Sequence, residues 1–269
     1  MTVPLLTLFA ALLVFLVGRT VPALAPLAVG CLVLLLIPST VWVLENLHLL
    51  LARLRLRPTR ASSRYIRALF DGYAPSFETD LMVDLRYAVP NLLMDIVTAH
   101  HDGRVSVALD LGCGTGICGP LFAPYCDRLT GIDLSAEMLR HARAKRCYDD
   151  LVQGDFTTYL HSHPIGVDLC IAADVLVYYG ALKQPLGAIA AGLRSGGQLA
   201  FTLEAHGSGD GPAGRGWYLR RTGRYAHEDT YVRRVAEEVG LETVACWHAC
   251  LRTQAGAPVE GLVLLLAKP

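Results

Sequence analysis

Two long uncharged runs open the chain and dominate its pattern of apolar and polar positions. Residues 1–18 carry no charged side chain, and after Arg19 residues 20–44 carry none either. At about 1.5 Å per residue, the second run is long enough for a helix to cross a hydrocarbon core of about 30 Å, whereas the first is marginal. We predict a transmembrane hairpin that turns at residues 18–22. One span with an interfacial first helix is the alternative, and buried helices of a soluble core would show the same pattern.

A basic segment follows the uncharged runs and indicates their orientation. Leucines 47, 50, 51 and 54 recur at helical spacing, so this stretch is typical of an amphipathic helix at the lipid headgroups that ends at Pro58. A solvated charged linker is the alternative. The segment 45–67 contains one acid, Glu45, and six arginines: Arg53, Arg55, Arg57, Arg60, Arg64 and Arg67. The positive-inside rule then places the rest of the chain on the cytoplasmic side of the inner membrane.

The pattern changes twice beyond the basic segment. Residues 62–100 are helical in rhythm, with breaks near residues 74–75 and at Pro90. From residue 105 short β-branched or apolar runs alternate with amphipathic helices, which is typical of a parallel sheet covered on both faces. We therefore predict three regions: a membrane hairpin with a juxtamembrane helix (1–57), a helical cap (58–104) and an α/β domain (105–269). The strands are expected at 105–110, 128–133, 150–153, 167–173 and 197–204, and the helices at 116–126, 135–146 and 181–194.

Composition narrows the class of protein. Apolar residues make up 53% of the 269 residues and the mean hydropathy is +0.39, which is high for a wholly soluble chain. Twenty-four basic residues balance twenty-four acidic ones, so no global positive field favours nucleic-acid binding. The eight cysteines show no CxxC pair and no Cys/His ligand spacing, so we expect reduced thiols and no metal site.

A glycine-rich turn carries the first chemical signal. The apolar run that ends at Asp110 continues directly into Gly112, Gly114 and Gly116, which open the next predicted helix. Glycines in such a turn let a ligand lie against the backbone at a helix N-terminus. The spacing is GxGxG rather than the GxGxxG of dinucleotide sites. Because the Asp110 carboxylate would repel a pyrophosphate and attract an ammonium, the pattern indicates a nucleoside that bears an amino acid.

With the motifs downstream, the turn at 110–116 resembles the cofactor loop of the class I S-adenosylmethionine-dependent methyltransferases. The segment 131–135 has an acid, Asp133, at the end of the second strand, followed by Leu134. The segment 153–156 ends in Asp155 and Phe156, and 167–176 is similar to the family's fourth-strand motif. The four motifs occur in the family's order. The resemblance extends over residues 104–269.

The resemblance implies a fold, a cofactor and a set of binding residues. The fold is a Rossmann-like, mostly parallel seven-stranded sheet with an antiparallel final strand, in which 243–251 pairs with 259–267. The cofactor is S-adenosyl-L-methionine. Asp133 would accept bonds from the ribose hydroxyls, Leu134 and Phe156 would lie at the adenine, and Asp155 would take its amino group. The full expected set is Asp110, Gly112, Gly114, Gly116, Asp133, Leu134, Asp155, Phe156, Ala173 and Tyr73.

Several of these residues also have plainer explanations. Asp133 is well placed to cap the helix that opens at Ser135, Asp155 is a common kind of turn residue, and Tyr73 would fit equally well in the core. In some bacterial relatives the region 64–74 follows tetratricopeptide repeats. In this chain the uncharged runs 1–18 and 20–44 precede that region instead of such repeats.

The chemistry of transfer is less defined by the sequence. A general base is needed only when the nucleophile keeps a proton. We predict Tyr178 as a catalytic candidate, because the carboxyl ends of strands four and five border the crevice of such sheets. His227 is the other candidate, because it follows a Gly-rich stretch, 207–216, that would form a lid, and it would equally serve as the start of a helix. Other polar residues expected in this region are Asp174, Tyr179, Glu204 and His206.

Two functions are compatible with these features. The first is a membrane-anchored methyltransferase that acts on a small or lipophilic acceptor. The second is an accessory subunit of a membrane protein complex that keeps the fold for binding, with small residues such as Gly18 and Gly30 allowing close helix packing. Membrane lipid and a membrane protein complex are therefore expected partners, and nucleic acid is not.

Overall fold

A computed structural model describes residues 58–81, 85–101, 103–163, 166–206, 214–254 and 256–269. They belong to one unit, Arg57–Pro269. The predicted membrane hairpin and juxtamembrane helix lie outside the described residues. Within the described ranges, no helix combines the length and apolar character that a membrane crossing requires.

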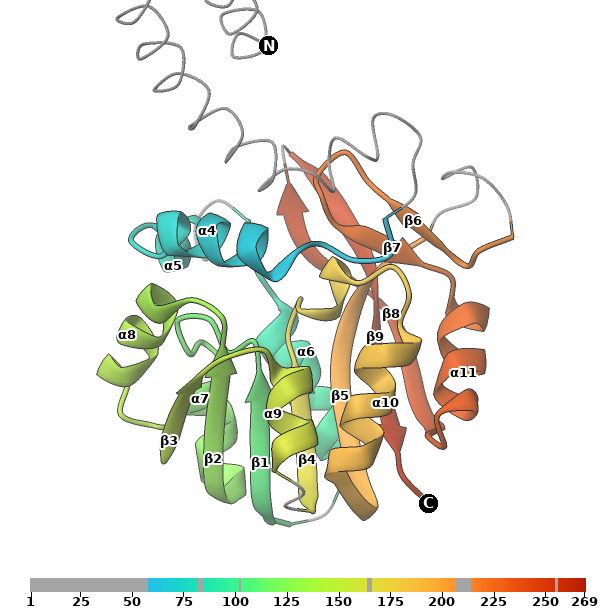
Figure 1. Cartoon of the computed structure of the whole chain (residues 1–269), viewed down its shortest axis with the longest axis horizontal. Helices are drawn as coiled ribbons and strands as arrows, with labels where there is room; N and C mark the ends of the chain where they lie inside the picture. Colours follow the sequence, from blue (N-terminus) through green and yellow to red (C-terminus); the bar gives the residue numbers. More distant parts are fainter. Residues whose placement is uncertain (1–57, 82–84, 102, 164–165, 207–213, 255) are drawn as a thin grey trace, which may run out of the picture. The chain divides into compact units, whose positions relative to one another are not determined.

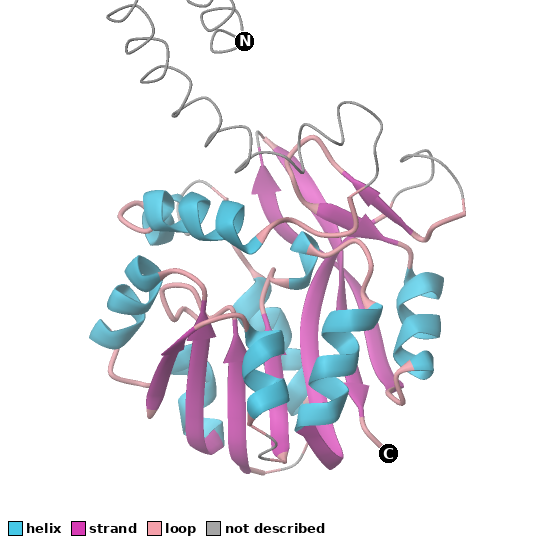
Figure 2. Cartoon of the chain, in the orientation of Figure 1, coloured by secondary structure: helices cyan, strands magenta, loops and turns pink. Residues whose placement is uncertain are grey.

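A single mixed sheet organises the described residues (Figures 1 and 2). Its main strands run in the order β3-β2-β1-β4-β5, all parallel, and β9 joins β5 antiparallel and carries β8 on its other side. These seven strands confirm the Rossmann-like sheet with an antiparallel final strand. Their bounds are Val105–Leu111 (β1), Cys126–Asp133 (β2), Asp150–Gln153 (β3), Val167–Ala172 (β4), Leu193–Ala205 (β5), Glu242–Gln254 (β8) and Ala257–Ala267 (β9).

A short hairpin extends the sheet to nine strands. It consists of β6 (Trp217–Leu219) and β7 (Tyr225–His227), and β7 pairs with the end of β5 at Glu204 and Ala205. This hairpin was not predicted from the sequence, because three-residue strands leave almost no periodic signal.

Helices cover both faces of the sheet, as the alternation of strands and helices predicts. Along β9, Leu262, Leu264 and Leu266 pack into one core, whereas Val263 and Leu265 pack into the other. Side chains point to opposite faces with a period of two, so an almost continuous apolar strand is what two cores require. The helices are α4 (Ser63–Tyr73), α5 (Phe77–Thr79), α6 (Val89–Thr98), α7 (Gly119–Phe122), α8 (Ala136–Ala144), α9 (Phe156–Ser162), α10 (Lys183–Gly192) and α11 (Asp229–Glu238).

The predicted cap is represented by α4, which lies over the carboxyl ends of the strands (Figure 1). The residues before it are tied to the loop after β4. The amide of Ala61 donates to the Tyr178 carbonyl at 2.8 Å, and the Gly180 amide donates to the Thr59 carbonyl at 2.8 Å. The Tyr225 hydroxyl donates to the Pro58 carbonyl at 3.0 Å. These bonds fix the cap above the crevice of the sheet.

Most predicted elements agree with the structure, and two helices differ. The helix expected over 116–126 is reduced to α7 and a 3-10 turn, Ala123–Tyr125, because Pro124 interrupts the helical hydrogen bonds. Pro90, taken as a break, lies in the first turn of α6, where a missing amide has no cost. The break near residues 74–75 is confirmed by the end of α4.

Candidate active site

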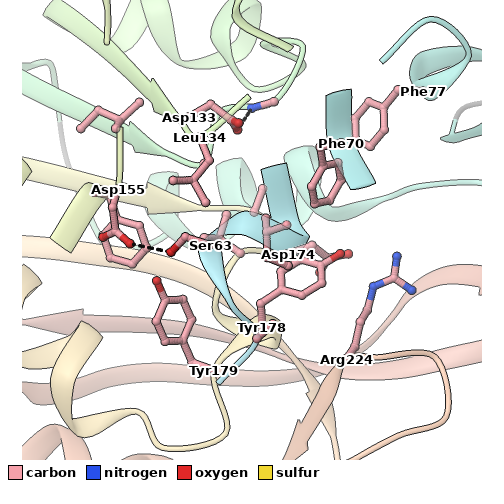
Figure 3. Close-up of a pocket in the computed structure, with 18 of the residues that line it drawn as sticks. Ser63, Phe70, Phe77, Asp133, Leu134, Asp155, Asp174, Tyr178, Tyr179 and Arg224 are labelled. Carbon is pink, nitrogen blue, oxygen red and sulfur yellow. Dashed lines mark hydrogen bonds between the residues drawn. The ribbon is translucent and has the colours of Figure 1, made fainter. Parts of the chain in front are cut away.

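A cavity of about 1000 Å³, including its open mouth, lies where the strand order reverses between β1 and β4. Ligands bind at this switch point in open α/β sheets. The cavity has two parts, described below as the cofactor half and the acceptor half (Figure 3). The described residues of the cofactor half are Gly112, Gly114, Ile132, Asp133, Leu134, Gly154, Asp155, Phe156 and Ala173. Those of the acceptor half include Phe70, Phe77, Leu81, Leu85, Tyr87, Asp174, Tyr178, Arg224 and Arg252.

The glycine turn after β1 forms one wall of the cofactor half. Gly112 has φ +66°, and a Cβ there would lie 2.5 Å from a methyl group of Val175. Gly114 has φ +57°, and its nearest neighbour in that direction is the ring of Phe77, at 3.8 Å. The backbone at Gly114 is therefore open to the cavity, which is the close approach that the sequence predicts.

Two aspartates at the ends of β2 and β3 face the same space. Asp133 accepts the Gly114 amide at 2.9 Å and the Ser135 amide at 2.8 Å, so it ties the glycine turn to the start of α8. Burial raises the pKa of Asp133 in spite of these bonds. Asp155 caps α9 through the Thr157 amide at 2.9 Å and also accepts the Ser63 hydroxyl at 3.4 Å. Both residues therefore combine a structural role with a place in the cavity wall.

Asp110 lies just behind the glycine turn and is 1% exposed. One carboxyl oxygen accepts the Tyr148 hydroxyl at 2.7 Å, and the other has no partner among the described residues. Burial, with a smaller contribution from the Asp133 charge, raises the pKa of Asp110 to about 7, although the Tyr148 bond opposes the shift. A buried carboxyl oxygen without a partner fits a ligand that brings an ammonium group.

The acceptor half is lined by aromatic rings and by charged groups that the fold has buried. Phe70 of α4 meets Tyr178 edge to face, with ring centroids 5.8 Å apart, and meets Phe77 at 6.0 Å. Tyr87 is partly buried, and burial raises the pKa of its hydroxyl well above the ordinary value. A rigid aromatic lining of this kind favours an acceptor with an apolar body.

A chain of ion pairs closes the floor of the acceptor half. Arg252, 2% exposed, donates to Asp174 at 2.7 Å and also pairs with Glu204, which is 1% exposed. Glu204 in turn accepts from Arg220 at 3.0 Å. Asp174 has φ +55°, an uncommon backbone conformation for aspartate, and Thr202 bonds to both its amide and its carboxylate at 3.0 Å. The network thus holds the end of β4 in a strained conformation beside the cavity.

The structure brings most of the predicted site residues together. The seven of the cofactor set that line the cavity are Gly112, Gly114, Asp133, Leu134, Asp155, Phe156 and Ala173, and the catalytic candidate Tyr178 lines it too. Asp110 borders a smaller adjoining pocket that shares Gly112 and Gly114. Gly116 and Tyr73 do not line the cavity. A Cβ at Gly116 would meet Tyr148 and Ala142, and Tyr73 packs on Phe77 with ring centroids 5.3 Å apart.

His227 is placed away from the cavity. It ends β7 rather than opening a helix, since α11 begins at Asp229 with Glu228 as its cap. Its side chain is fully buried, and Nε2 lies 3.2 Å from the Gly180 carbonyl oxygen. Burial lowers the pKa of His227 to about 4. A neutral imidazole enclosed in this way speaks against the predicted catalytic role and favours a role in holding the loop after β4.

Two cavity residues, Arg224 and Arg252, were missed from the sequence. Arg224 follows the turn of the β6–β7 hairpin, and Arg252 lies in β8. The segment 223–227 resembles the family, but Arg224 was not expected to line the site. Arg252 follows the mostly apolar run 244–251, and a charge is buried in such a place only with partners.

The fold and the cofactor half together define a nucleoside-binding class I methyltransferase architecture, and the sequence comparisons agree. Residues 108–197 match the family described as a methyltransferase domain. The malonyl-[acyl-carrier protein] O-methyltransferase of Pectobacterium atrosepticum is 31% identical over 48% of this chain and 49% of its own length. The trans-aconitate 2-methyltransferase of Rhizobium rhizogenes is 33% identical over 37% of this chain and 39% of its own. The chain thus spans about half or less of the length of these two relatives.

A solved structure extends the similarity. The N-methyltransferase NodS from Bradyrhizobium japonicum, in complex with S-adenosyl-L-homocysteine, has 25% identity and a TM-score of 0.52 over 66% of this chain and 84% of its own. Residues 108–197 therefore form a methyltransferase domain of the class I S-adenosylmethionine-dependent type. Its cofactor is S-adenosyl-L-methionine, and the open backbone at Gly114 and the unpartnered oxygen of Asp110 fit that molecule.

Proposed function

We propose that this chain transfers a methyl group from S-adenosylmethionine to a small-molecule acceptor. The observation that carries the proposal is a cavity in which a cofactor half built from Gly114, Asp133 and Asp155 adjoins a half lined by aromatic rings. The cofactor supplies a methyl group on a sulfonium that is already a good leaving group, so the protein mainly binds, orients and desolvates the reactants.

The chain's own residues have distinct tasks in this proposal. Asp133 and Asp155 would bind the ribose and the adenine, and Asp110 would bind the ammonium of the methionine part. Phe70 and Tyr178 would position the acceptor under the α4 cap, which the bonds to residues 178–180 hold in place.

The experiment that tests the function is transfer of a labelled methyl group. Purified full-length chain in detergent is incubated with labelled S-adenosylmethionine and a total extract of the host cells, and products are identified by mass. We expect one class of small molecule to gain one labelled methyl group in place of a hydrogen, about 14 mass units plus the increment of the isotope, and Asp133→Ala to abolish the gain. Failure of the chain to label any component, while it binds S-adenosylhomocysteine, would favour the accessory-subunit function instead.

We also propose that residues 1–57 anchor the enzyme to the cytoplasmic membrane and that its acceptor is lipophilic. The support is the pair of uncharged runs, 1–18 and 20–44, and the arginines that follow them. Anchoring would raise the local concentration of an acceptor dissolved in the bilayer. Alkaline carbonate washing of membranes that contain the full chain tests the anchor. The chain should stay with the membranes, and its release into the supernatant would contradict anchoring.

A further inference from the structure

Arg224 is set apart from the other arginines near the cavity by its partners. Arg252 pairs with Asp174 and Glu204, and Arg220 pairs with Glu204. Arg224 has no carboxylate within ion-pair distance in the described part of the chain, and its bond to the Gln254 side chain is long, at 3.5 Å. A guanidinium has five N–H donors. Gln254 and the Tyr178 hydroxyl engage two of those of Arg224, and the others are available to a ligand.

The position of the Arg224 guanidinium in the cavity is as important as the absence of a carboxylate partner among the described residues. Figure 3 shows its guanidinium at the far side of the cavity from Asp133 and Asp155, next to the hydroxyl end of Tyr178. Burial alone would lower the pKa of Arg224, but Tyr178 and the charges of Asp174 and Glu204 raise it above its ordinary value. The guanidinium therefore stays charged inside a largely apolar wall.

The charged groups around this wall are not all paired with one another. Arg252 pairs with both Asp174 and Glu204, whereas Arg224 has no carboxylate at ion-pair distance among the described residues. A ligand with a carboxylate group would supply that partner. Arginine binds a carboxylate with two parallel hydrogen bonds, which makes it the side chain best suited to this task.

The described lining also lacks an available general base. It contains no histidine, lysine or glutamate. Asp174 is occupied by Arg252 and Thr202, and Asp133 and Asp155 accept backbone amides. A nucleophile that had to lose a proton would find no free carboxylate or imidazole among these residues. An acceptor atom that arrives without a proton, as a carboxylate oxygen does at neutral pH, fits this lining.

We propose that Arg224 binds a carboxylate group of the acceptor and that this carboxylate is the methylated group. One carboxylate oxygen donates an electron pair to the methyl carbon, and the carbon–sulfur bond breaks with its electrons left on sulfur. The products are a methyl ester and S-adenosylhomocysteine, and no proton is released. This inference rests on the proposed function and names its substrate class. The names of the two sequence relatives, which contain malonyl and trans-aconitate, are consistent with it.

Binding tests the carboxylate site without requiring turnover. Full-length chain saturated with S-adenosylhomocysteine is titrated with malonate, trans-aconitate and octanoate, each beside its uncharged amide. At least one acid should bind about tenfold more tightly than its amide, since a charge-assisted pair is lost with the amide. Arg224→Gln should remove this preference. Arg221→Gln, an exposed arginine in the same hairpin turn, should keep it.

Three results would overturn the carboxylate site: no acid is preferred, Arg224→Gln keeps the preference, or Arg221→Gln loses it equally. Affinity for S-adenosylhomocysteine should be unchanged in both variants, which shows that they are folded. Arg224→Lys provides a second measure, because it keeps the charge without the paired donors and should retain a weaker preference.

The labelled product separates this inference from the proposed function. Mild base should release the transferred methyl group as methanol, as expected for a methyl ester. At saturating S-adenosylmethionine the transfer rate should be nearly constant between pH 6 and 9, because the nucleophile does not have to lose a proton. A base-stable label would contradict the carboxylate acceptor and leave methyl transfer intact. No label at all would count against the proposed function, whereas the binding preference for acids would still be measurable.

Discussion

The two halves of the cavity are built in different ways. The cofactor half comes from short segments that follow consecutive strands, and its side chains are fixed by backbone amides, such as those of Gly114 and Ser135 on Asp133. The acceptor half combines α4, the loop after β4, the β6–β7 hairpin and β8, and its charged side chains are fixed by one another. One half depends on local backbone geometry and the other on long-range ion pairing.

This difference has a mechanistic meaning. A cofactor shared by a whole class requires the same donors and acceptors in every member, and a strand end followed by a turn provides them reproducibly. An acceptor differs between members, so its half is assembled from elements whose contacts can change without disturbing the sheet. A single substitution should therefore impair either cofactor binding or acceptor binding, and not both.

The largest effect is expected from Arg252→Met in the acceptor half. Removing this guanidinium leaves the carboxylates of Glu204 and Asp174 buried with fewer partners, which should lower the free energy of unfolding by about 3–5 kcal/mol. Chemical denaturation measures the change. Arg234→Met is the matched control, because Arg234 forms an exposed pair with Glu238 and should cost less than about 1 kcal/mol. Equal losses in the two variants would show that the buried network adds nothing.

The next largest effect should come from Asp133→Ala in the cofactor half. The substitution removes both the acceptor for the Gly114 amide and the expected ribose contact, so affinity for S-adenosylhomocysteine should fall at least about 100-fold. Calorimetry measures it. Asp127→Ala lies near the opposite end of the same strand, on the surface, and should bind normally. Unchanged affinity in Asp133→Ala would refute the ribose assignment.

A smaller, pH-dependent effect is expected at Asp110. Its pKa is raised to about 7 in the protein, above that of an unfolded chain, so the protonated form is favoured by folding and the associated stability is lost as pH rises through 7. Binding of an ammonium requires the carboxylate. Affinity for S-adenosylhomocysteine should therefore fall by up to about tenfold per pH unit below 7, with proton release on binding.

The substitution Asp110→Asn tests the source of that pH dependence. It should bind more weakly at pH 8 and show a flat profile between pH 5.5 and 8, because the amide does not titrate in this range. A slope that persists in Asp110→Asn would assign the titration to another group.

The smallest effect on transfer is expected from His227→Gln. His227 is buried outside the cavity, so the transfer rate should change by less than about threefold, whereas loss of its contact with the Gly180 carbonyl should cost about 1–2 kcal/mol of stability. Because the pKa of His227 is lowered to about 4, its contribution to stability is present above pH 6.5 and is lost as pH falls towards 4. A large drop in rate with stability unchanged would restore the catalytic role.

The fold could be predicted from the sequence wherever a strand or helix was long enough to show its period. β3 was expected at residues 150–153, where it lies, and the pairing of 243–251 with 259–267 is found between β8 and β9. The β6–β7 hairpin and α9 were missed. The hairpin's strands have three residues each, and α9 begins at the very motif, Asp155–Phe156, that was interpreted only for its binding role.

The site could be predicted only where its residues adjoin a motif. Asp133, Asp155 and Gly114 were found because the family resemblance covers contiguous segments that end in the cavity. Arg224 and Arg252 were not found, since pairing between β5, β7 and β8–β9 brings them to the cavity from the other end of the sheet. Contacts of that kind depend on tertiary packing, and a single sequence does not show which strands will bring two distant residues to one cavity.

An experimental structure of the full chain with S-adenosylhomocysteine would test the central claim most directly. We predict that the ribose hydroxyls lie at the Asp133 carboxylate, the adenine between Leu134 and Phe156 with its amino group at Asp155, and the ammonium at the free oxygen of Asp110. A cofactor bound elsewhere, or a cavity without it at saturating concentration, would contradict the assignment of the cofactor half.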